Sequence, residues 1–324
     1  MEVFFVMILV TGAAGFVGSN ICKVLLHKGY NVLGVDCFYN NYSKSIKEFN
    51  LRHLYGNPEF TFLESNILDP NISKLIEGLK IDSIIHLADI PGVTTCSEVN
   101  FDEYIKYNIT GTQRLLEAVK NKGIKKLIYA SSSTVYGDTG EISMSELHNP
   151  KPISLYGVSK LAGETLCHYY GKTYNIDIDI FRFFTIYGPN QRPDMAFHKF
   201  IRNMLMNEEI NVYGDGRQKR DFIYIDDICE ILLEAVENNI KEEIINIGGG
   251  LSLSVNESIK IIEKVLNKEA KVNYIKPIQE EQLITHANVE KMNNIMSSKK
   301  RTDIYDGIKG EVEYIKQLYN LHHI

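Results

Sequence analysis

A short apolar stretch near the start of the chain runs directly into a glycine-rich turn. Residues Met7–Val10 are apolar, and they are followed by Thr11-Gly12-Ala13-Ala14-Gly15-Phe16-Val17-Gly18. Such a run, followed by glycines and by an amphipathic stretch over Gly15–Lys28, predicts a buried strand, a tight turn and a helix. Glycine is required where a turn is tight and where a ligand or another backbone approaches closely. A strand buried on both faces needs parallel partners, so this unit constrains the rest of the fold.

The first half of the chain repeats this alternation of apolar runs and amphipathic stretches. Strand, helix and strand at this spacing predict an α/β protein with a doubly wound parallel sheet. Ile84-Ile85-His86-Leu87 has the composition of a central strand that is buried on both faces. We expect strands at Met7–Val10, Asn31–Val35, Phe60–Glu64, Ser83–Leu87, Lys126–Ala130 and Asp177–Phe183, and helices at Gly15–Lys28, Asn71–Leu79, Glu103–Asn121 and Ile153–Tyr174.

After about Thr185 the pattern becomes less regular. Gly188-Pro189 and Tyr213-Gly214-Asp215-Gly216 are turn signals. We expect one more strand at Ile244–Ile247, and helices at Phe222–Val236, Asn256–Leu266 and Glu311–Leu321.

Composition excludes several classes of function. The 324 residues suffice for two lobes, and a net charge of −6 gives no electrostatic reason to bind nucleic acid or an anionic membrane. The apolar run Val3–Val10 is too short to span a bilayer and has no basic leader, so we expect a cytoplasmic protein. The five cysteines show no metal-ligand spacing, which predicts reduced thiols and no metal; they are Cys22, Cys37, Cys96, Cys167 and Cys229.

The glycine-rich turn predicts a dinucleotide site. Gly12, Gly15 and Gly18 follow a strand and open a helix, and a pyrophosphate would sit on the free N–H groups at the helix start. Asp36 closes the next strand, eighteen residues after Gly18. A carboxylate there accepts hydrogen bonds from a ribose 2′-OH and repels a 2′-phosphate, which favours NAD over NADP.

A second group of reactive side chains follows the expected strand Lys126–Ala130. Tyr156 stands four residues before Lys160 on an expected helix, so both side chains lie on one face. The lysine charge favours the phenolate, which can take a proton from a sugar or alcohol hydroxyl. Alone, Tyr156 would be a surface tyrosine and Ser131-Ser132-Ser133 a polar strand exit. Together with the glycine turn, they predict hydride chemistry on a hydroxyl-bearing substrate.

These motifs, with His86-Leu87-Ala88 and Ser131-Ser132-Ser133-Thr134-Val135-Tyr136-Gly137, resemble the extended short-chain dehydrogenase/reductase family, and within it the nucleotide-sugar 4-epimerases. The resemblance runs from about Met7 to Ile247. It implies a Rossmann-type NAD-binding domain at residues 1–184, which residues 220–248 rejoin, and a smaller C-terminal nucleotide-sugar-binding domain at residues 185–324. It also implies a UDP-sugar substrate and a homodimer that packs through helices around Glu103–Lys120 and Ile153–Tyr174.

The resemblance also implies roles for single residues. Tyr156 matches the catalytic tyrosine, Lys160 the lysine that holds the nicotinamide ribose, and Ser132 the residue that bonds the sugar 4-OH. The cofactor would be bound by Gly12, Gly15, Phe16, Val17, Gly18, Asp36, Asn66, Ile67, Leu87, Ala88, Tyr156 and Lys160.

Neighbouring positions narrow the reaction by the same resemblance. In 4,6-dehydratases an Asp-Glu pair occupies the positions of Ser133 and Thr134, and decarboxylating relatives typically carry glutamate at Thr134. Neither carboxylate is present. The remaining reaction is oxidation at C4, rotation of the keto sugar and return of hydride to its other face.

The substrate is indicated by Thr185 and by Arg192-Pro193-Asp194-Met195, which are similar to UDP-glucuronate 4-epimerases. Neutral-hexose epimerases usually have asparagine at the Thr185 position. The likeness implies that Arg192, with Ser133, Thr134 and Thr185, holds the sugar carboxylate, and that Arg220 meets the diphosphate; a guanidinium fork suits both anions.

Alternatives stay open at this stage. Arg192 could pair with Asp194, and Arg220-Asp221 could be a surface turn. The protein could then be a UDP-glucose or UDP-N-acetylhexosamine 4-epimerase. A dehydratase, a decarboxylase or a non-catalytic NAD-binding module is a weaker alternative.

Three positions depart from the family pattern. Asp89 stands where relatives have alanine, which places an acid near the cofactor. Asn66-Ile67 replaces the usual acid beside the adenine. Gln279-Glu280-Glu281-Gln282 stands where relatives carry Gln-Pro-Gly-Asp, which bears on the nucleotide contact.

Overall fold

The computed structural model describes residues 6–92, 100–140, 142–238, 240, 243–277, 282–298 and 301–321. Cys96 and the segment Gln279-Glu280-Glu281, about which the sequence raised expectations, lie outside these residues. Among the helices that are described, none is both long and apolar enough to cross a membrane.

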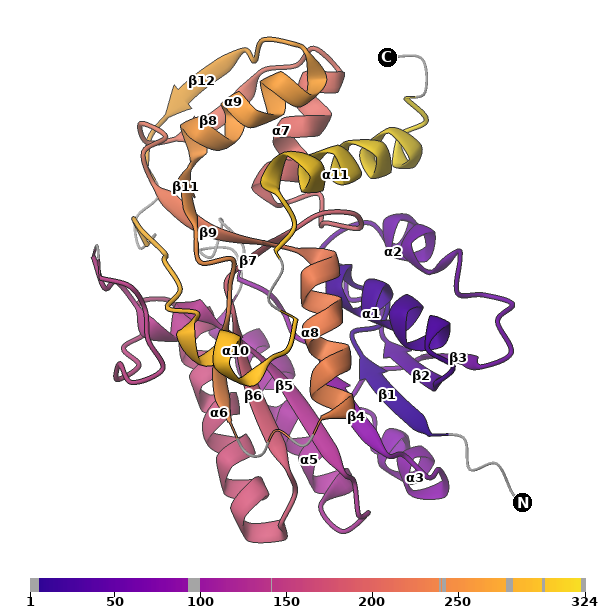
Figure 1. Cartoon of the computed structure of the whole chain (residues 1–324). Helices are drawn as coiled ribbons and strands as arrows, with labels where there is room; N and C mark the ends of the chain where they lie inside the picture. Colours follow the sequence, from indigo (N-terminus) through magenta and orange to yellow (C-terminus); the bar gives the residue numbers. More distant parts are fainter. Residues whose placement is uncertain are drawn as a thin grey trace.

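The larger lobe is built on one sheet of seven parallel strands, in the order β10-β6-β5-β4-β1-β2-β3 (Figure 1). The order reverses direction at β1, whose neighbours are β2 and β4, and this switch opens a crevice at the carboxyl ends of the strands. The predicted doubly wound parallel sheet is confirmed. The strands are β1 (Met7–Thr11), β2 (Asn31–Asp36), β3 (Phe60–Glu64), β4 (Ser83–His86), β5 (Lys126–Ser132), β6 (Ile178–Phe183) and β10 (Ile244–Ile247).

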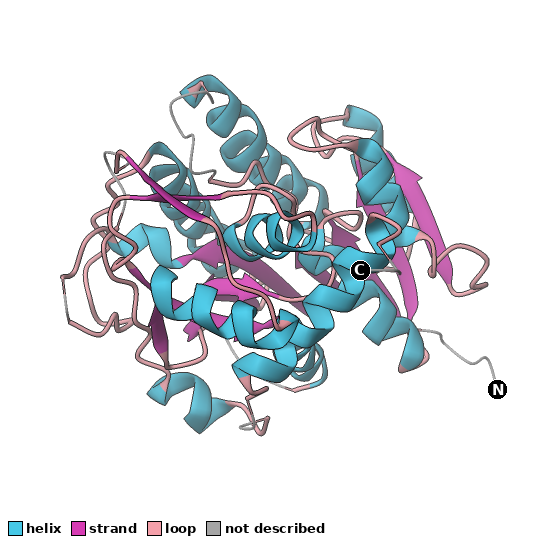
Figure 2. Cartoon of the chain, turned by 90° about the horizontal axis from the view of Figure 1, so that it is seen from above, coloured by secondary structure: helices cyan, strands magenta, loops and turns pink. Residues whose placement is uncertain are grey.

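The alternation of side chains along each strand feeds two cores. Ile8 and Val10 of β1 pack on the face covered by α1 (Phe16–His27) and α8 (Ile225–Glu237). Leu9 points the other way, into the core under α3 (Pro70–Gly78), α5 (Gly111–Val119) and α6 (Leu155–Tyr174). Figure 2 shows the sheet with helices around it. Because both faces are covered, the central strands are buried on both sides, and the polar residues among them, such as Asp179 and Arg182, are paired with other side chains.

The smaller lobe lies above the carboxyl ends of the large sheet (Figure 1). It holds a three-stranded sheet in the order β11-β9-β7 and a two-stranded sheet of β8 and β12. Further helices and strands of the chain are α2 (Lys44–Leu51), β7 (Thr185–Tyr187), α7 (Ala196–Leu205), β8 (Ile210–Tyr213), β9 (Lys219–Tyr224), β11 (Ser252–Ser254), α9 (Val255–Leu266), β12 (Val272–Ile275), α10 (Glu290–Ile295) and α11 (Ile304–Leu318).

Two helices begin three or more residues away from the first residue that the sequence predicted for them. The helix expected from Phe222 starts at Ile225, because Phe222 and Tyr224 belong to β9 and pair with Thr185 and Tyr187 of β7. Alternating aromatic residues suit a strand once a partner strand is at hand. The last helix begins at Ile304 rather than Glu311, since the side chain of Asp303 caps it by accepting from the N–H of Tyr305.

Glu311 on α11 provides a test of this packing. One carboxyl oxygen accepts from the N–H of Gly188 at 2.8 Å, while Oε1 is buried without a hydrogen-bond partner among the described residues. Burial raises the pKa of Glu311 well above its usual value. A raised folded-state pKa means that the fold holds the protonated acid, so stability falls as pH rises from the unfolded pKa of about 4.3 through the folded one.

We therefore expect Glu311→Gln to be more stable than the parent at pH 8, by about 1–3 kcal/mol, with a flatter pH profile. Urea denaturation at several pH values between pH 5 and pH 8 measures the free energy of unfolding and how it falls as pH rises. Glu313→Gln, an exposed change on the same helix, is the control. Parallel pH profiles for the parent and Glu311→Gln would show that the carboxyl is ionised in the fold.

Candidate active site

A cavity of about 610 Å³ lies at the switch point of the large sheet and extends to the smaller lobe. Its size and position are those of a small-molecule site. It brings together every site residue that the sequence predicted, from segments that are far apart along the chain. These are Gly12, Gly15, Phe16, Val17, Gly18, Asp36, Asn66, Ile67, Leu87, Ala88, Ser132, Ser133, Thr134, Tyr156, Lys160, Thr185, Arg192 and Arg220.

The glycine turn has no room for side chains at two positions. Gly12 has φ +72°, and a Cβ there would lie 2.9 Å from the backbone nitrogen of Ala88. A Cβ on Gly18 would lie 2.1 Å from the carbonyl oxygen of Gly12. Gly15 starts α1, and no side chain caps this helix end. The N–H groups of its first turn are therefore available to an anion such as a pyrophosphate, which fits the expected dinucleotide.

Asp36 is held in place at the end of β2. Its Oδ2 accepts from the N–H of Ala14 at 3.0 Å and its Oδ1 from the N–H of Phe38 at 2.8 Å. Burial raises the pKa of Asp36, and these hydrogen bonds and the charge of Lys47 oppose that rise. Each oxygen keeps lone-pair capacity for a further donor, such as a ribose hydroxyl.

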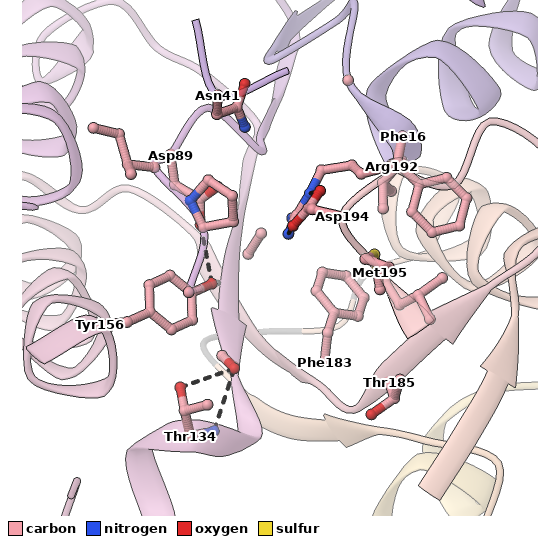
Figure 3. Close-up of a pocket in the computed structure, with 18 of the residues that line it drawn as sticks. Phe16, Asn41, Asp89, Thr134, Tyr156, Phe183, Thr185, Arg192, Asp194 and Met195 are labelled. Carbon is pink, nitrogen blue, oxygen red and sulfur yellow. Dashed lines mark hydrogen bonds and ion pairs between the residues drawn. The ribbon is translucent and has the colours of Figure 1, made fainter. Parts of the chain in front are cut away.

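Tyr156 and Lys160 lie one turn apart on α6, whose start is capped by Ser154 through the N–H of Gly157. Both side chains reach the carboxylate of Asp89, which follows β4, and Figure 3 shows the contact of Tyr156. Asp89 Oδ2 accepts from Tyr156 Oη at 3.1 Å and from Lys160 Nζ at 3.0 Å. In the structure, Asp89 therefore joins the expected pair of Tyr156 and Lys160.

The pKa of Tyr156 reflects this group. Burial, and then the charge and hydrogen bond of Asp89, raise the pKa of the phenol well above its ordinary value. The ammonium of Lys160 lies 5.9 Å from the centre of the Tyr156 ring, and its charge is matched by Asp89. Without further positive charge, Tyr156 is a neutral phenol.

After β5, Ser133 and Thr134 begin a short 3₁₀ turn, Ser133–Tyr136, at the wall of the cavity. Ser132 caps this turn: its Oγ accepts from the N–H of Thr134 at 3.2 Å and from the Thr134 hydroxyl at 3.0 Å (Figure 3). Beneath it, Ser131 donates to buried Glu164, which pairs with Arg182. This layer fixes the direction in which the hydroxyls face the cavity.

Arg192 lies in the cavity with its fork occupied by a carboxylate of the same loop. Nε donates to Asp194 Oδ1 at 2.9 Å and Nη2 to Asp194 Oδ2 at 2.8 Å (Figure 3). The alternative partner considered from the sequence is therefore the one found. Thr185 lines the same cavity.

Arg220 is not in a surface turn. It lies in β9 opposite Leu253 of β11 and lines the cavity, and its Nη1 donates to the carbonyl oxygens of Lys219 and Leu283. Asp221 points to the other side of the strand, where it accepts from the N–H groups of Gly249 and Ala287.

Residues 8–248 match the NAD dependent epimerase/dehydratase family. The chain belongs to this family. The resemblance drawn from its motifs is thereby confirmed.

Several proteins that resemble this chain carry names of UDP-sugar epimerases. The uncharacterized UDP-glucose epimerase YtcB of Bacillus subtilis is 40% identical, covering 96% of this chain and 98% of that protein. The UDP-glucuronate 4-epimerase of Thermodesulfobacterium geofontis is 36% identical, covering 95% of this chain and 96% of that protein. The crystal structure of UDP-glucuronic acid 4-epimerase from Bacillus cereus, in complex with UDP-glucuronic acid and NAD, has 43% identity and a TM-score of 0.92, covering 97% of this chain and 100% of that one.

Sequence reasoning did not find Asn108. It lies in a π-helical turn, Ile105–Thr110, between α4 (Phe101–Tyr104) and α5. Its amide accepts from the N–H of Ile90 at 2.7 Å, donates to the carbonyl of Ile90 at 2.9 Å and donates to Ser159 at 3.0 Å. It therefore ties the segment after β4 to α6. The only local signal was an amide in an otherwise amphipathic helix, which is weak because most such residues face solvent.

Proposed function

We propose that this chain is an NAD-dependent UDP-glucuronate 4-epimerase, which interconverts UDP-glucuronate and UDP-galacturonate through a 4-keto intermediate. The observation that carries the proposal is one cavity that holds the Tyr156–Lys160 pair, the hydroxyls of Ser132 to Thr134 and the guanidinium of Arg192. The names of the relatives from Thermodesulfobacterium geofontis and Bacillus cereus support it.

The residues of the chain divide the work. NAD, when bound, accepts hydride from the sugar and returns it. The glycine turn and Asp36 hold the cofactor, and Lys160 binds and orients it near Tyr156. Tyr156 takes the proton of the sugar 4-OH and gives it back after the keto sugar has turned. Ser132 bonds the same hydroxyl and orients it.

Arg192 binds the sugar carboxylate in this proposal. Thr185, Ser133 and Thr134 line the same cavity and add hydroxyl donors. The 4-keto intermediate is a β-keto acid, so a carboxylate held by hydrogen bonds in the ring plane is less able to leave as CO₂. The substrate carboxylate has to replace Asp194 on the guanidinium, and both carboxylates match its fork.

One observation favours a second candidate. If Asp194 keeps the fork of Arg192, this guanidinium is not available to a sugar carboxylate, and a neutral hexose suits the cavity better. The name of the Bacillus subtilis relative agrees with a UDP-glucose epimerase.

Incubation with NAD and UDP-glucuronate, followed by NMR, tests the proposal. We expect UDP-galacturonate to form, and UDP-glucose and UDP-N-acetylglucosamine to turn over at least about tenfold more slowly, since about 1.4 kcal/mol of transition-state binding suffices for that. Fast turnover of UDP-glucose without turnover of UDP-glucuronate would select the second candidate. Release of CO₂ would indicate a decarboxylase instead.

We further propose that the two lobes share the ligands. Residues 1–184, with residues 220–248, would bind NAD, and residues 185–324 would bind the nucleotide sugar, with Arg220 at the diphosphate. A charged fork is suited to a diphosphate.

The cysteines among the described residues are all free thiols, Cys22, Cys37, Cys167 and Cys229, which supports a place in the reducing cytoplasm.

We also propose a homodimer. Ile105 on the π-turn and Leu155 and Val158 on α6 are 39%, 46% and 38% exposed, which is unusual for large apolar side chains on neighbouring helices. Packing of these helices against a second copy would bury them. Light scattering is expected to give the mass of two chains, and Val158→Glu to shift it toward one. A monomer at micromolar concentration would refute the dimer.

Asp36 is expected to decide the choice of cofactor. Asp36→Asn removes the charge that accepts from a ribose hydroxyl and repels a 2′-phosphate, so NAD affinity falls about tenfold or more and NADP affinity rises. Calorimetric titration of the cofactor-stripped protein with each dinucleotide measures both. Glu64→Gln, at the end of the adjacent strand β3 and paired on the surface with Lys44, should change neither affinity. Equal preference for NAD in parent and Asp36→Asn would contradict this role.

A further inference from the structure

The carboxylate of Asp89 occupies a position from which it touches both members of the catalytic pair. A single oxygen, Oδ2, accepts from Tyr156 Oη at 3.1 Å (Figure 3) and from Lys160 Nζ at 3.0 Å. The side chain of Lys160 is only 4% exposed and that of Asp89 20% exposed, so these contacts are largely sheltered from solvent. Neither the family match nor the relatives' names assign this residue a task.

The backbone on each side of Asp89 is fixed. On one side, the N–H of Ala88 donates to the hydroxyl of Thr11 at 3.1 Å. On the other, the amide of Asn108 bonds both the N–H and the carbonyl of Ile90. Asn108 also bonds Ser159, which precedes Lys160 on α6. The fold therefore holds Asp89 at a defined place relative to the catalytic helix.

The charges around the Tyr156 phenol cancel in pairs. The ammonium of Lys160 is matched by Asp89, and the guanidinium of Arg192 by Asp194. A phenolate at Tyr156 would therefore lie at hydrogen-bond distance from a carboxylate. Both cations, Lys160 and Arg192, are already paired with a carboxylate. The titratable and charged groups that face Tyr156 from the elements packed against it are Asp89, Lys160, Tyr129, Tyr104 and Arg192.

We propose that Asp89 is a positioning residue that holds the proton on Tyr156 and the ammonium of Lys160 beside it, so that the catalytic phenolate forms only at higher pH than the pair alone would allow. Asp89 accepts the phenol hydrogen bond, which stabilises the protonated form, and it repels the phenolate. The inference rests on the proposed function for its consequence in catalysis. The effect of Asp89 on the ionisation of Tyr156 does not depend on which substrate the protein binds.

The proposal predicts a specific change in the titration of one tyrosine. In Asp89→Asn, which keeps the size and a hydrogen-bond acceptor, and in Asp89→Ala, the phenol of Tyr156 should ionise at a lower pH than in the parent, with an about tenfold or larger rise in phenolate at a given pH. NMR of protein labelled at the tyrosine ring carbon that bears oxygen measures this ionisation. The Tyr156 signal among 19 tyrosines is identified by its loss in Tyr156→Phe.

Activity gives a second reading. With UDP-glucuronate, the acid limb of the kcat/KM profile should move to lower pH in both Asp89 variants, in step with the tyrosine titration. Asp306→Asn removes an exposed carboxylate from α11 and should change neither quantity. Circular dichroism verifies that each variant is folded.

Two results would overturn the proposal. If the titration of Tyr156 is the same in parent, Asp89→Asn and Asp89→Ala, the carboxylate does not control the proton. If the Asp89 variants lose activity at every pH while Tyr156 titrates as before, Asp89 would be a proton acceptor in the reaction instead. A shifted titration with no turnover of UDP-glucuronate would support the proposal and remove the proposed function.

Discussion

Tyr156→Phe is expected to abolish epimerisation and to leave the fold intact. In the proposed function the phenol oxygen accepts the proton of the sugar 4-OH, and loss of a general base lowers kcat by about 10²–10⁴-fold or more. The ring is partly buried beside Tyr104 and against Gly92, and phenylalanine keeps this packing. The rate of UDP-galacturonate formation, followed by NMR at saturating UDP-glucuronate, measures the effect on kcat.

A second tyrosine on the same helix provides the matched control. Tyr169 is 55% exposed and does not line the cavity, so Tyr169→Phe should retain the parent rate. Tyr156→Phe should still bind NAD with nearly parental affinity, because the glycine turn and Asp36 are proposed to make most of the cofactor contacts. Activity within tenfold of the parent in Tyr156→Phe would transfer the role of base to another group.

Arg192→Met is expected to reverse the preference for acidic over neutral sugars. Truncating one partner of a buried charge pair costs about 2–5 kcal/mol, so kcat/KM for UDP-glucuronate should fall by about 10²-fold or more, while that for UDP-glucose should not fall. Part of the loss would come from Asp194, which the substitution leaves without its cation. Steady-state kinetics with both sugars measure the change in preference.

Variants at Asp194 separate these contributions. Arg192→Met with Asp194→Asn removes both charges, and a continued loss of UDP-glucuronate turnover then reports the guanidinium alone. Asp194→Asn by itself frees the fork and should lower KM for UDP-glucuronate. Arg202→Met, an arginine on α7 that pairs with Glu208 at the surface, should leave both sugars unaffected. An unchanged sugar preference in the double variant would place the carboxylate elsewhere and favour a neutral substrate.

Much of the larger lobe could be predicted because its signals are local. The apolar run Met7–Val10 became β1, which the structure extends by one residue, and Phe60–Glu64 and Ile244–Ile247 are strands with the predicted bounds. The glycines of the turn follow a strand and open a helix, which is the context in which this spacing indicates a dinucleotide site. Tyr156 and Lys160 share a face because of the helical period alone.

Other elements could not be predicted from local pattern. In the sequence, Phe222 and Tyr224 fit an amphipathic helix, and only their pairing with β7 makes them part of a strand. The strands β8, β11 and β12 are four, three and four residues long, and pairing with distant segments determines them. Propensity is weak at such lengths, so the tertiary context decides.

Within the candidate site, the sequence determined which chemical groups are present and which of them neighbour one another along one element: the glycine turn, the carboxylate of Asp36 and the tyrosine and lysine of α6. The tertiary structure decided the contacts between elements. It brought Asp89 to Tyr156, across 67 residues, and to Lys160, across 71 residues. A helical or strand period fixes directions only within its own element, whereas the partner of a charge depends on where the whole sheet and both lobes place it.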